Sequence, residues 1–325
     1  MLNRRILRIK AFKVLYAYAE NQDLSLEEVL DSLETSCEAT RDLYLYMMAL
    51  IPALTAEASR RIEAARGKFN PTEEDLHPNL KFAANGISAL LEQDPDLRRL
   101  LEKKKLSWEQ NDAFLFSLYE TLRTRPYYQA YMAEPVQSLS GDAALWKEVF
   151  TQEFEDDGQL AAILEDRSIY WADDLGYVLG CCLRSLDSMA EKGRWDFPPL
   201  YQSDVLIARG KKGVDSDRQF VRRLVTTAYG HYSYYDKLIA ESVAKWDEDR
   251  LKWDKDRLFT TDIVLIILGL AEVDTFPEIP AAVSINEYVE ISKYYSTPRS
   301  HSFVNGLLDR LVKQQLAQGK TSKTL

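Results

Sequence analysis

The sequence is poor in the residues that interrupt regular structure and in those that cross-link it. Among 325 residues there are only 13 glycines, 11 prolines and three cysteines. Scarce glycine and proline exclude collagen-like and linker-like chains and disfavour a β-sandwich, which needs many turns. Two of the cysteines are adjacent, Cys181 and Cys182, and none forms a CxxC metal site or a disulfide framework, so we expect a reducing, cytoplasmic compartment.

Long apolar runs are also missing. The longest, residues 263–271, is far shorter than the about 18 residues that a membrane-spanning helix needs, so we expect no membrane partner. With 46% hydrophobic and 28% charged residues, the chain is not of the disordered class and can bury a sizeable core. Apolar residues recur at helical spacing along most of the chain, which predicts an all-α protein.

Charge is unevenly distributed. The net charge of −10 argues against a protein that coats nucleic acid with its whole surface. Residues 1–18 carry five basic and no acidic side chains, residues 299–325 carry a net +4, and residues 19–298 carry −19. Basic ends on an acidic body offer anions a confined binding site if the ends meet in space, and the alternative is that they are solvated tails.

The basic N-terminal segment has the periodicity of an amphipathic helix. Its apolar residues form one stripe at 3.6 residues per turn: Leu7, Ala11, Val14, Leu15 and Tyr18. Four residues point away from this stripe and are expected on the exposed face: Arg5, Arg8, Phe12 and Lys13. A basic face with one exposed ring is typical of single-stranded RNA recognition, although a phenylalanine can also pack against a neighbouring element.

Residues that carry catalytic chemistry are few. The histidines, His77, His231 and His301, have no carboxylate or cysteine at metal-ligand spacing, and no HExxH or Gly-x-Ser-x-Gly motif occurs. The Gly-Lys-Lys-Gly segment at 210–213 lacks the preceding strand and the following Ser or Thr of a P-loop, which predicts a basic loop. We therefore expect no catalytic residue, no metal, no cofactor and no enzyme activity.

The most specific pattern lies near the C-terminus. Residues 279–293 read Ile-Pro-Ala-Ala-Val-Ser-Ile-Asn-Glu-Tyr-Val-Glu-Ile-Ser-Lys, and residues 300–309 read Ser-His-Ser-Phe-Val-Asn-Gly-Leu-Leu-Asp. These two segments resemble the C-terminal signature of the NusB family of transcription antitermination factors. Arg4, Arg5 and Arg8 resemble the arginine-rich first helix of the same family.

The likeness covers residues 1–20 and 217–315, and the long middle segment resembles an insertion found in a subset of NusB homologues. The resemblance implies an all-α, NusB-like helical bundle with a large helical insertion. Its three parts would be an N-terminal helix in residues 1–30, the insertion in 31–215 and the C-terminal part of the bundle in 216–325. It also implies that residues 1–30 pack against residues 217–315.

The resemblance further implies a cytoplasmic, non-enzymatic protein that binds the boxA element of nascent ribosomal RNA in the transcription elongation complex. The partner in this family is NusE, a ribosomal small-subunit protein. By position, the implied RNA-binding residues are Arg4, Arg5, Arg8, Lys10, Phe303 and Asn305, and Asp262 is the implied contact with NusE. Arg299 and Ser302 depart from the aspartate and lysine of the family, which puts the RNA contacts around them in question.

Two other hypotheses stay open at this point. The chain can be a helical protein-interaction scaffold without significant RNA binding, with the insertion as its main surface. It can also be an RNA-modifying enzyme, because NusB-like domains occur fused to RNA methyltransferases, but the chain has no glycine-rich strand-to-helix turn for a nucleotide cofactor.

Overall fold

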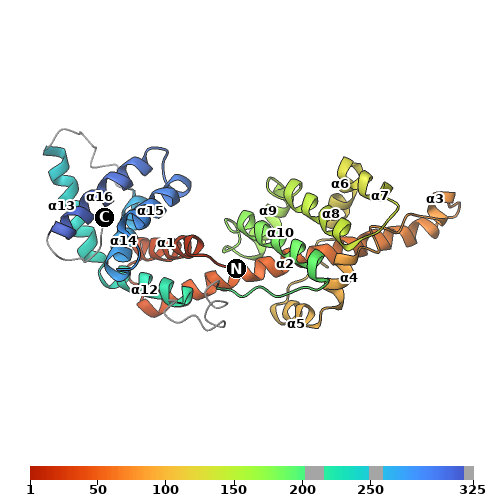
Figure 1. Ribbon diagram of the computed structural model, residues 1–325, viewed down its shortest axis with the longest axis horizontal. Coiled ribbons are helices and arrows are strands. Elements are labelled where there is room, and N and C mark those ends of the chain that lie inside the picture. The colour runs from red at the N-terminus through yellow and green to blue at the C-terminus, as the bar shows by residue number, and fades with distance from the viewer. Residues whose placement is uncertain (202–215, 249–258, 318–325) are drawn as a thin grey trace. The chain divides into compact units, whose positions relative to one another are not determined.

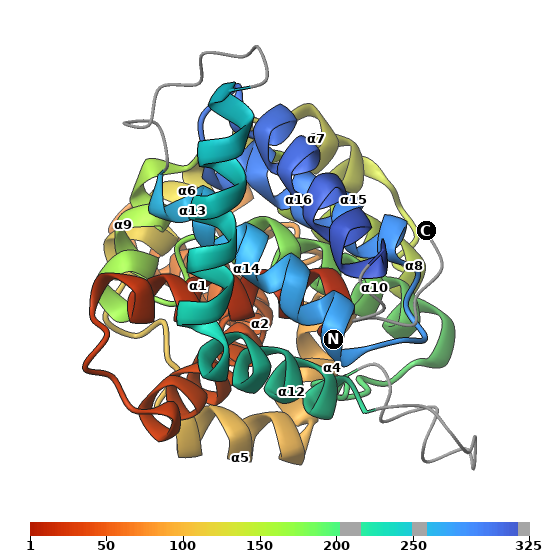
Figure 2. The same cartoon turned by 90° about the vertical axis from the view of Figure 1, so that its left-hand side faces the viewer.

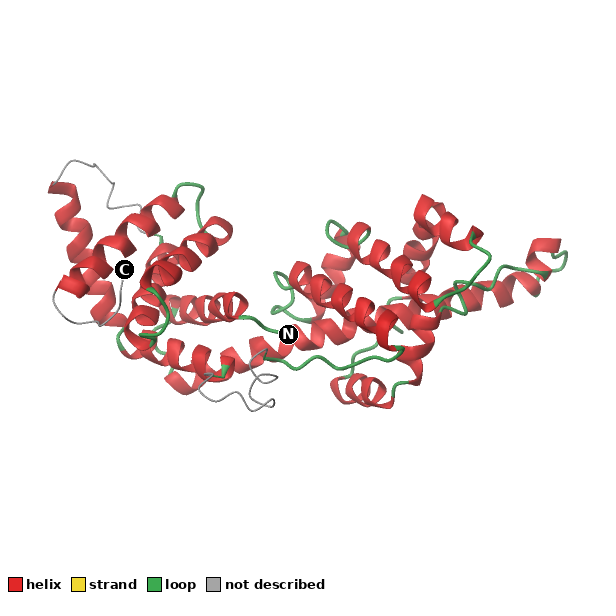
Figure 3. Ribbon diagram, in the orientation of Figure 1, coloured by secondary structure: helices red, strands yellow, loops and turns green. Residues whose placement is uncertain are grey.

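The computed structural model describes residues 1–201, 216–248 and 259–317, with side chains up to 244 in the second range. These residues form fifteen helices (Figure 1) and, apart from one β-bridge between Leu2 and Tyr201, no strand pairing (Figure 3). The predicted all-α class is confirmed. The Gly-Lys-Lys-Gly segment at 210–213 lies outside the described residues. None of the helices in the described ranges has both the length and the hydrophobicity to span a bilayer.

The chain divides into two compact units. Unit 1 comprises residues 1–37 and 199–325, and unit 2 comprises residues 38–198, compared with the insertion expected at 31–215. The first difference arises because helix α2 (Leu26–Arg66) runs through position 30 without a break. The second arises because the backbone of Met1 and Leu2 donates hydrogen bonds to the carbonyls of Pro199 and Leu200, which ties this segment to unit 1.

Unit 1 is a bundle around one central helix. Besides the start of α2 it contains α1 (Arg4–Glu20), α12 (Asp217–Gly230), α13 (Tyr232–Glu248), α14 (Thr260–Thr275), α15 (Ala281–Tyr295) and α16 (Ser300–Ala317). Helix α14 lies in the middle, and the other five pack against it (Figure 2). Residues 264–273 of α14 are all buried, which explains why the longest apolar run of the sequence lies here.

Helix α1 packs on α12 and α14, as the resemblance implied. Leu7, Ala11 and Leu15 are fully buried in this contact, so the predicted apolar stripe is confirmed for these positions. The first helix therefore completes the C-terminal bundle although a whole unit intervenes in the sequence.

Unit 2 is helical, as expected for the insertion. After α2 it contains α3 (Glu73–Leu76), α4 (Gly86–Gln93), α5 (Pro95–Lys104), α6 (Asp112–Thr124), α7 (Pro126–Ala133), α8 (Leu139–Gln152), α9 (Gly158–Arg167) and α10 (Leu175–Lys192). Residues 38–198 contain 28 acidic and 18 basic residues, which accounts for the whole net charge of −10.

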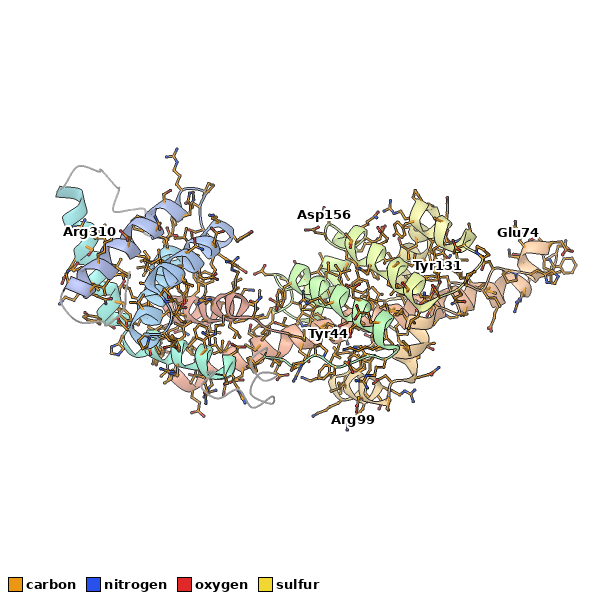
Figure 4. All side chains as sticks on the ribbon, in the orientation of Figure 1. Tyr44, Glu74, Arg99, Tyr131, Asp156 and Arg310 are labelled. Carbon is orange, nitrogen blue, oxygen red and sulfur yellow. The ribbon has the colours of Figure 1, made fainter. Side chains whose placement is uncertain are left out.

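The middle of α2 forms the core of unit 2. Every residue from 43 to 51 is buried, and Tyr44 lies inside this unit whereas Glu74 and Arg99 lie at its surface (Figure 4). Three indole nitrogens donate to α2: Trp171 to the Ala39 carbonyl at 2.9 Å, Trp108 to the Tyr46 carbonyl at 2.8 Å, and Trp195 to the Tyr44 hydroxyl at 3.0 Å. These tryptophans are therefore core residues, as the sequence indicates.

Helix α2 contains a proline, Pro52, and continues through it without a break. A proline inside a helix costs about 3 kcal/mol, because it removes a donor and its ring clashes with the preceding turn. The buried surface of residues 43–51 offsets this cost through the hydrophobic effect. The Thr55 hydroxyl also donates to the Pro52 carbonyl at 3.1 Å, so this acceptor next to the irregular turn has a hydrogen-bond partner.

Gly269 marks the closest approach between α14 and α16. A Cβ atom on Gly269 would lie 2.7 Å from Leu308 Cδ2 and 3.4 Å from Tyr288 Cδ2. We expect Gly269→Ala to lower the free energy of unfolding by about 1–2 kcal/mol in urea denaturation, because overpacking outweighs the helix propensity gained. Gly230→Ala, where a Cβ meets nothing within 4 Å, is the control and should not destabilise. Equal losses in both variants would contradict this account.

Candidate nucleic-acid interface

Side chains of α1 contact side chains of α15 in the same order along the two helices. Arg5 Nη2 donates to Glu287 Oε1 at 2.8 Å and Arg5 Nε donates to Glu287 Oε2 at 3.0 Å. Two turns later the Phe12 ring lies 5.2 Å from the Tyr295 ring, centroid to centroid. The hydrogen bonds from Arg5 hold the pKa of Glu287 below its usual value.

A buried ion pair fixes α1 in this position. Arg8 is 4% exposed, and its Nε and Nη2 atoms each donate to a carboxylate oxygen of Glu272 at 2.7 Å. The same carboxylate accepts from the hydroxyls of Ser284 and Tyr288, both at 2.8 Å. Burial alone would lower the pKa of Arg8, but the hydrogen bonds and charge of Glu272 raise it above its ordinary value. Arg8 thus stays charged and holds α1 against α14 and α15.

The expectation that Arg8 and Phe12 lie on an exposed face of α1 is wrong. Both side chains are buried, and so is Lys10. The residue that turns Arg8 inward, Glu272, lies 264 positions away in the sequence, beyond the reach of helical periodicity. While α1 is docked, Arg8 and Lys10 cannot present their charges to phosphates in solvent.

Of the remaining implied RNA-binding residues, one is buried and the others are accessible. Phe303 is buried in α16, whereas Asn305 on the same helix is exposed. Arg4 is half-buried, with its Nε atom 3.4 Å from Asp217 Oδ1, and the Arg5 side chain is 51% exposed. The structure therefore leaves Arg4, Arg5 and Asn305 accessible.

Asp262 points into unit 1, not toward solvent. It is 2% exposed, and its two carboxylate oxygens accept from the hydroxyls of Ser296 at 2.6 Å and Ser300 at 2.9 Å. Burial raises the pKa of Asp262, and the two serine hydrogen bonds partly oppose this shift. Asp262 therefore positions the segment that leads into α16 and carries Arg299, and it does not offer its charge to a partner.

Other accessible side chains extend the interface beyond the implied set. Lys13 and Tyr16 lie near the end of α1, Tyr294 at the end of α15 is 84% exposed, and Arg299 is exposed just before α16. The Lys13 ammonium lies 6.0 Å from the centre of the Tyr295 ring, which brings the end of α1 to the end of α15. We call Arg5, Lys13, Tyr16, Tyr294 and Arg299 the basic seam.

Sequence reasoning missed Tyr294, although a signal was present. It falls off the stripe that Tyr288, Ile291 and Tyr295 form on α15, and all three of these residues are buried or half-buried. An aromatic residue off the buried stripe of an amphipathic helix is expected to be exposed to solvent.

The described His, Cys, Asp and Glu side chains do not gather in groups of three or more that could hold a metal ion. Cys181 and Cys182 are free and buried, and burial raises the pKa of both thiols, so they stay in the unreactive protonated form.

The NusB family model matches residues 201–313, which contain α12 to α15 and most of α16. Transcription antitermination protein NusB from Methylacidiphilum infernorum is 38% identical over 119 residues, which cover 37% of this chain and 69% of that protein. This chain belongs to the NusB family. Unit 2 falls outside the family match, as does helix α1.

Two further relatives carry the same name. NusB from Thermodesulfovibrio yellowstonii is 32% identical over 106 residues, 33% of this chain and 66% of that protein. NusB from Salinibacter ruber is 40% identical over 109 residues, 34% of this chain and 64% of that protein. The chain thus spans about two thirds of the length of these NusB relatives. No solved structure matches the chain significantly.

The two arginines that contact Glu287 should differ sharply in their effect on stability. Arg8→Gln leaves the Glu272 carboxylate buried without its cation, which we expect to lower the free energy of unfolding by about 3–5 kcal/mol. Arg5→Gln removes a mostly exposed ion pair and should cost at most about 1 kcal/mol. Chemical denaturation followed by circular dichroism measures both. A loss of similar size in the two variants would show that the buried pair does not hold the bundle together.

Asp262 should make stability depend on pH in a defined direction. Burial raises the pKa of Asp262 in the folded state, so ionisation of this carboxyl destabilises the folded protein. Below the ordinary pKa of 3.8 the carboxyl is protonated in the folded and in the unfolded state, and this destabilisation is absent. Asn at this position keeps an acceptor and carries no charge. We expect the unfolding free energy of Asp262→Asn, relative to the unmodified protein, to rise between about pH 4 and about pH 7. Urea titrations across this range test it, and a flat or falling difference contradicts it.

Proposed function

We propose that this NusB-family protein is a transcription antitermination factor that binds boxA-type RNA together with NusE in the transcription elongation complex. The observation that carries the proposal is the docking of the basic helix α1 onto the helices that match the NusB family. In keeping with the family, the protein would act in the cytoplasm without a cofactor or a catalytic step.

The basic seam has the composition that single-stranded RNA requires. Arg5, Lys13 and Arg299 supply positive charge for phosphates, and Tyr16 and Tyr294 supply exposed rings for base stacking. Asn305 can donate to and accept from a base edge. Arg4 and Arg5 would contact the RNA directly. Arg8 would contribute indirectly, because it holds the helix that carries them.

The scaffold hypothesis remains the alternative, with unit 2 as its binding surface. The surplus of acidic residues in unit 2 disfavours it as a surface for phosphates but is compatible with a basic protein partner. Salt dependence separates the two hypotheses, because an RNA-binding protein releases counterions and a scaffold without RNA affinity does not.

Removing two cations of the basic seam should weaken RNA binding in a salt-dependent way. For the Arg5→Gln, Lys13→Gln double variant we expect roughly tenfold weaker binding to a boxA-type RNA oligonucleotide near 0.1 M salt. The slope of log K against log salt should fall by about 1.4, since each single-strand phosphate contact contributes about 0.7. Fluorescence anisotropy over a salt series measures both quantities.

The matched control makes the same charge change on unit 2. Arg99 and Lys103 are both exposed on α5, so Arg99→Gln with Lys103→Gln should leave affinity and slope unchanged. Both double variants should still bind NusE in a pull-down. The proposed function fails if the unmodified protein binds the RNA without a salt-dependent affinity, or if the two double variants lose affinity equally.

A further inference from the structure

Unit 1 contains a second site, apart from the basic seam. Helices α12, α13 and the end of α14 line a cleft of about 710 Å³, and Figure 2 shows where these three helices meet. This volume lies within the range of about 300–1,000 Å³ that is usual for ligand sites. Two guanidinium groups, three rings, three threonines, a glutamine and a carboxylate line it, and none of them belongs to the residues implied by family resemblance.

The guanidinium groups are held at the wall of the cleft. Arg222 Nη1 donates to Glu34 at 3.0 Å, and 44% of the Arg222 side chain stays exposed. Arg223 Nη2 donates to the Thr275 carbonyl at 3.0 Å, and its guanidinium lies 4.8 Å from the centre of the Phe276 ring. A guanidinium has five N–H donors, so the single bond of Arg222 to Glu34 orients the group and leaves it able to bind an anionic oxygen.

Three rings cluster on the opposite wall, at the start of α13. The ring of Tyr235 lies 5.9 Å from that of His231 and 5.5 Å from that of Tyr234. Tyr235 is buried, and its hydroxyl donates to Asp274 Oδ2 at 2.7 Å. Tyr234 is 45% exposed and His231 is exposed as well. The buried ring thus supports two exposed rings that can stack on a planar group.

We propose that this cleft binds a nucleotide of single-stranded RNA, on the part of the strand that continues beyond the basic seam. The inference rests on the proposed function, in that the same RNA strand contacts both sites. Arg222 and Arg223 face the phosphate, Tyr234 stacks on the base, and the Thr226 and Thr227 hydroxyls lie within the cleft for the sugar and the base edge.

The chemistry of the cleft favours RNA over an acidic peptide. Exposed rings next to guanidinium groups match alternating bases and phosphates, whereas an acidic peptide offers no planar groups to stack. The Asp274 carboxylate in the wall would repel glutamate and aspartate side chains, but a carboxylate can accept from a 2′-hydroxyl or a base N–H.

The path from the seam to the cleft is short and basic. Arg4, at the start of α1, lies beside Asp217, the first residue of α12. From Asp217 to Thr227, which lines the cleft, α12 rises about 15 Å at 1.5 Å per residue. Arg222 and Arg223, the exposed arginines that line the cleft, lie within this stretch. A strand needs only a few nucleotides beyond the seam to reach the cleft.

RNA length is the first measurement. Fluorescence anisotropy with the full chain compares a boxA-type RNA oligonucleotide with the same RNA extended by six nucleotides at each end. We expect the extension to strengthen binding about tenfold, as one added stacking and phosphate contact does. If the extended RNA binds no more tightly than the core RNA, the proposal is wrong.

Matched variants then show which residues account for the tighter binding of the extended RNA. Arg218 and Arg222 both bind Oε1 of Glu34, but only Arg222 lines the cleft. Arg222→Gln should remove most of the gain and lower the salt slope for the extended RNA by about 0.7, whereas Arg218→Gln should do neither. Tyr234→Ala should also remove most of the gain, and Tyr234→Phe, which keeps the ring, should retain it.

The outcomes distinguish this inference from the proposed function. If the boxA-type oligonucleotide without added nucleotides does not bind, the result counts against the basic seam. The cleft is tested only by the change in affinity that the added nucleotides produce. Equal effects of Arg218→Gln and Arg222→Gln on that response overturn the cleft as an RNA site. So does displacement of the extended portion by a poly-glutamate peptide, which would show that the cleft takes acidic protein segments.

Discussion

The ion pair between Arg8 and Glu272 decides where the first helix lies, and the accessible surface of unit 1 follows from it. Taking two charges out of water is costly, and only good geometry with further hydrogen bonds repays it. Here the carboxylate has four donors, two from Arg8 and one each from Ser284 and Tyr288. A shift of α1 by one residue would break this set, so the pair specifies the register of α1 more than it adds to stability. Arg5 opposite Glu287 and Phe12 opposite Tyr295 are consequences of that register.

The short distance between the two ends of unit 2 explains how the bundle of unit 1 tolerates an insertion of this size. In unit 2 the ends of the chain meet, because the Arg41 guanidinium lies 5.5 Å from the centre of the Phe197 ring. In unit 1 the backbone of Met1 and Leu2 holds residues 199 and 200. Insertions are tolerated where their ends lie close together, and the entropy of closing a longer loop grows only logarithmically with length. The family bundle therefore stays intact around an added acidic unit.

Periodicity predicted the parts of the structure that depend on neighbours within one helix. The stripe of Leu7, Ala11 and Leu15 is buried as expected, and the all-α class follows from many such stripes. Arg8 was assigned to the wrong side because periodicity treats every charged residue as solvated, and its partner is remote in sequence. Asp262 was assigned by family resemblance and not by periodicity, and neither reveals that its carboxylate accepts from Ser296 and Ser300 of a different segment. Pro52 shows a limit of local rules, because tertiary burial around α2 overrides a local helix breaker. The cleft at α12 requires three helices to meet, and no local pattern in the sequence reveals it.

The distance along the chain between Arg8 and Glu272 also has a consequence for biosynthesis. At about 5–20 residues per second, the ribosome needs roughly 15–50 s to make the 264 residues that separate them. During this time the apolar stripe of α1 has been made but the helices that cover it have not. Unit 2 has all of its own sequence once residue 198 has been made, so it can fold before unit 1 is assembled. Until α14 and α15 have been made, the nascent chain carries an uncovered hydrophobic helix, which makes it a substrate for chaperones that bind such segments. Its basic surface is assembled only after residue 299 has been made.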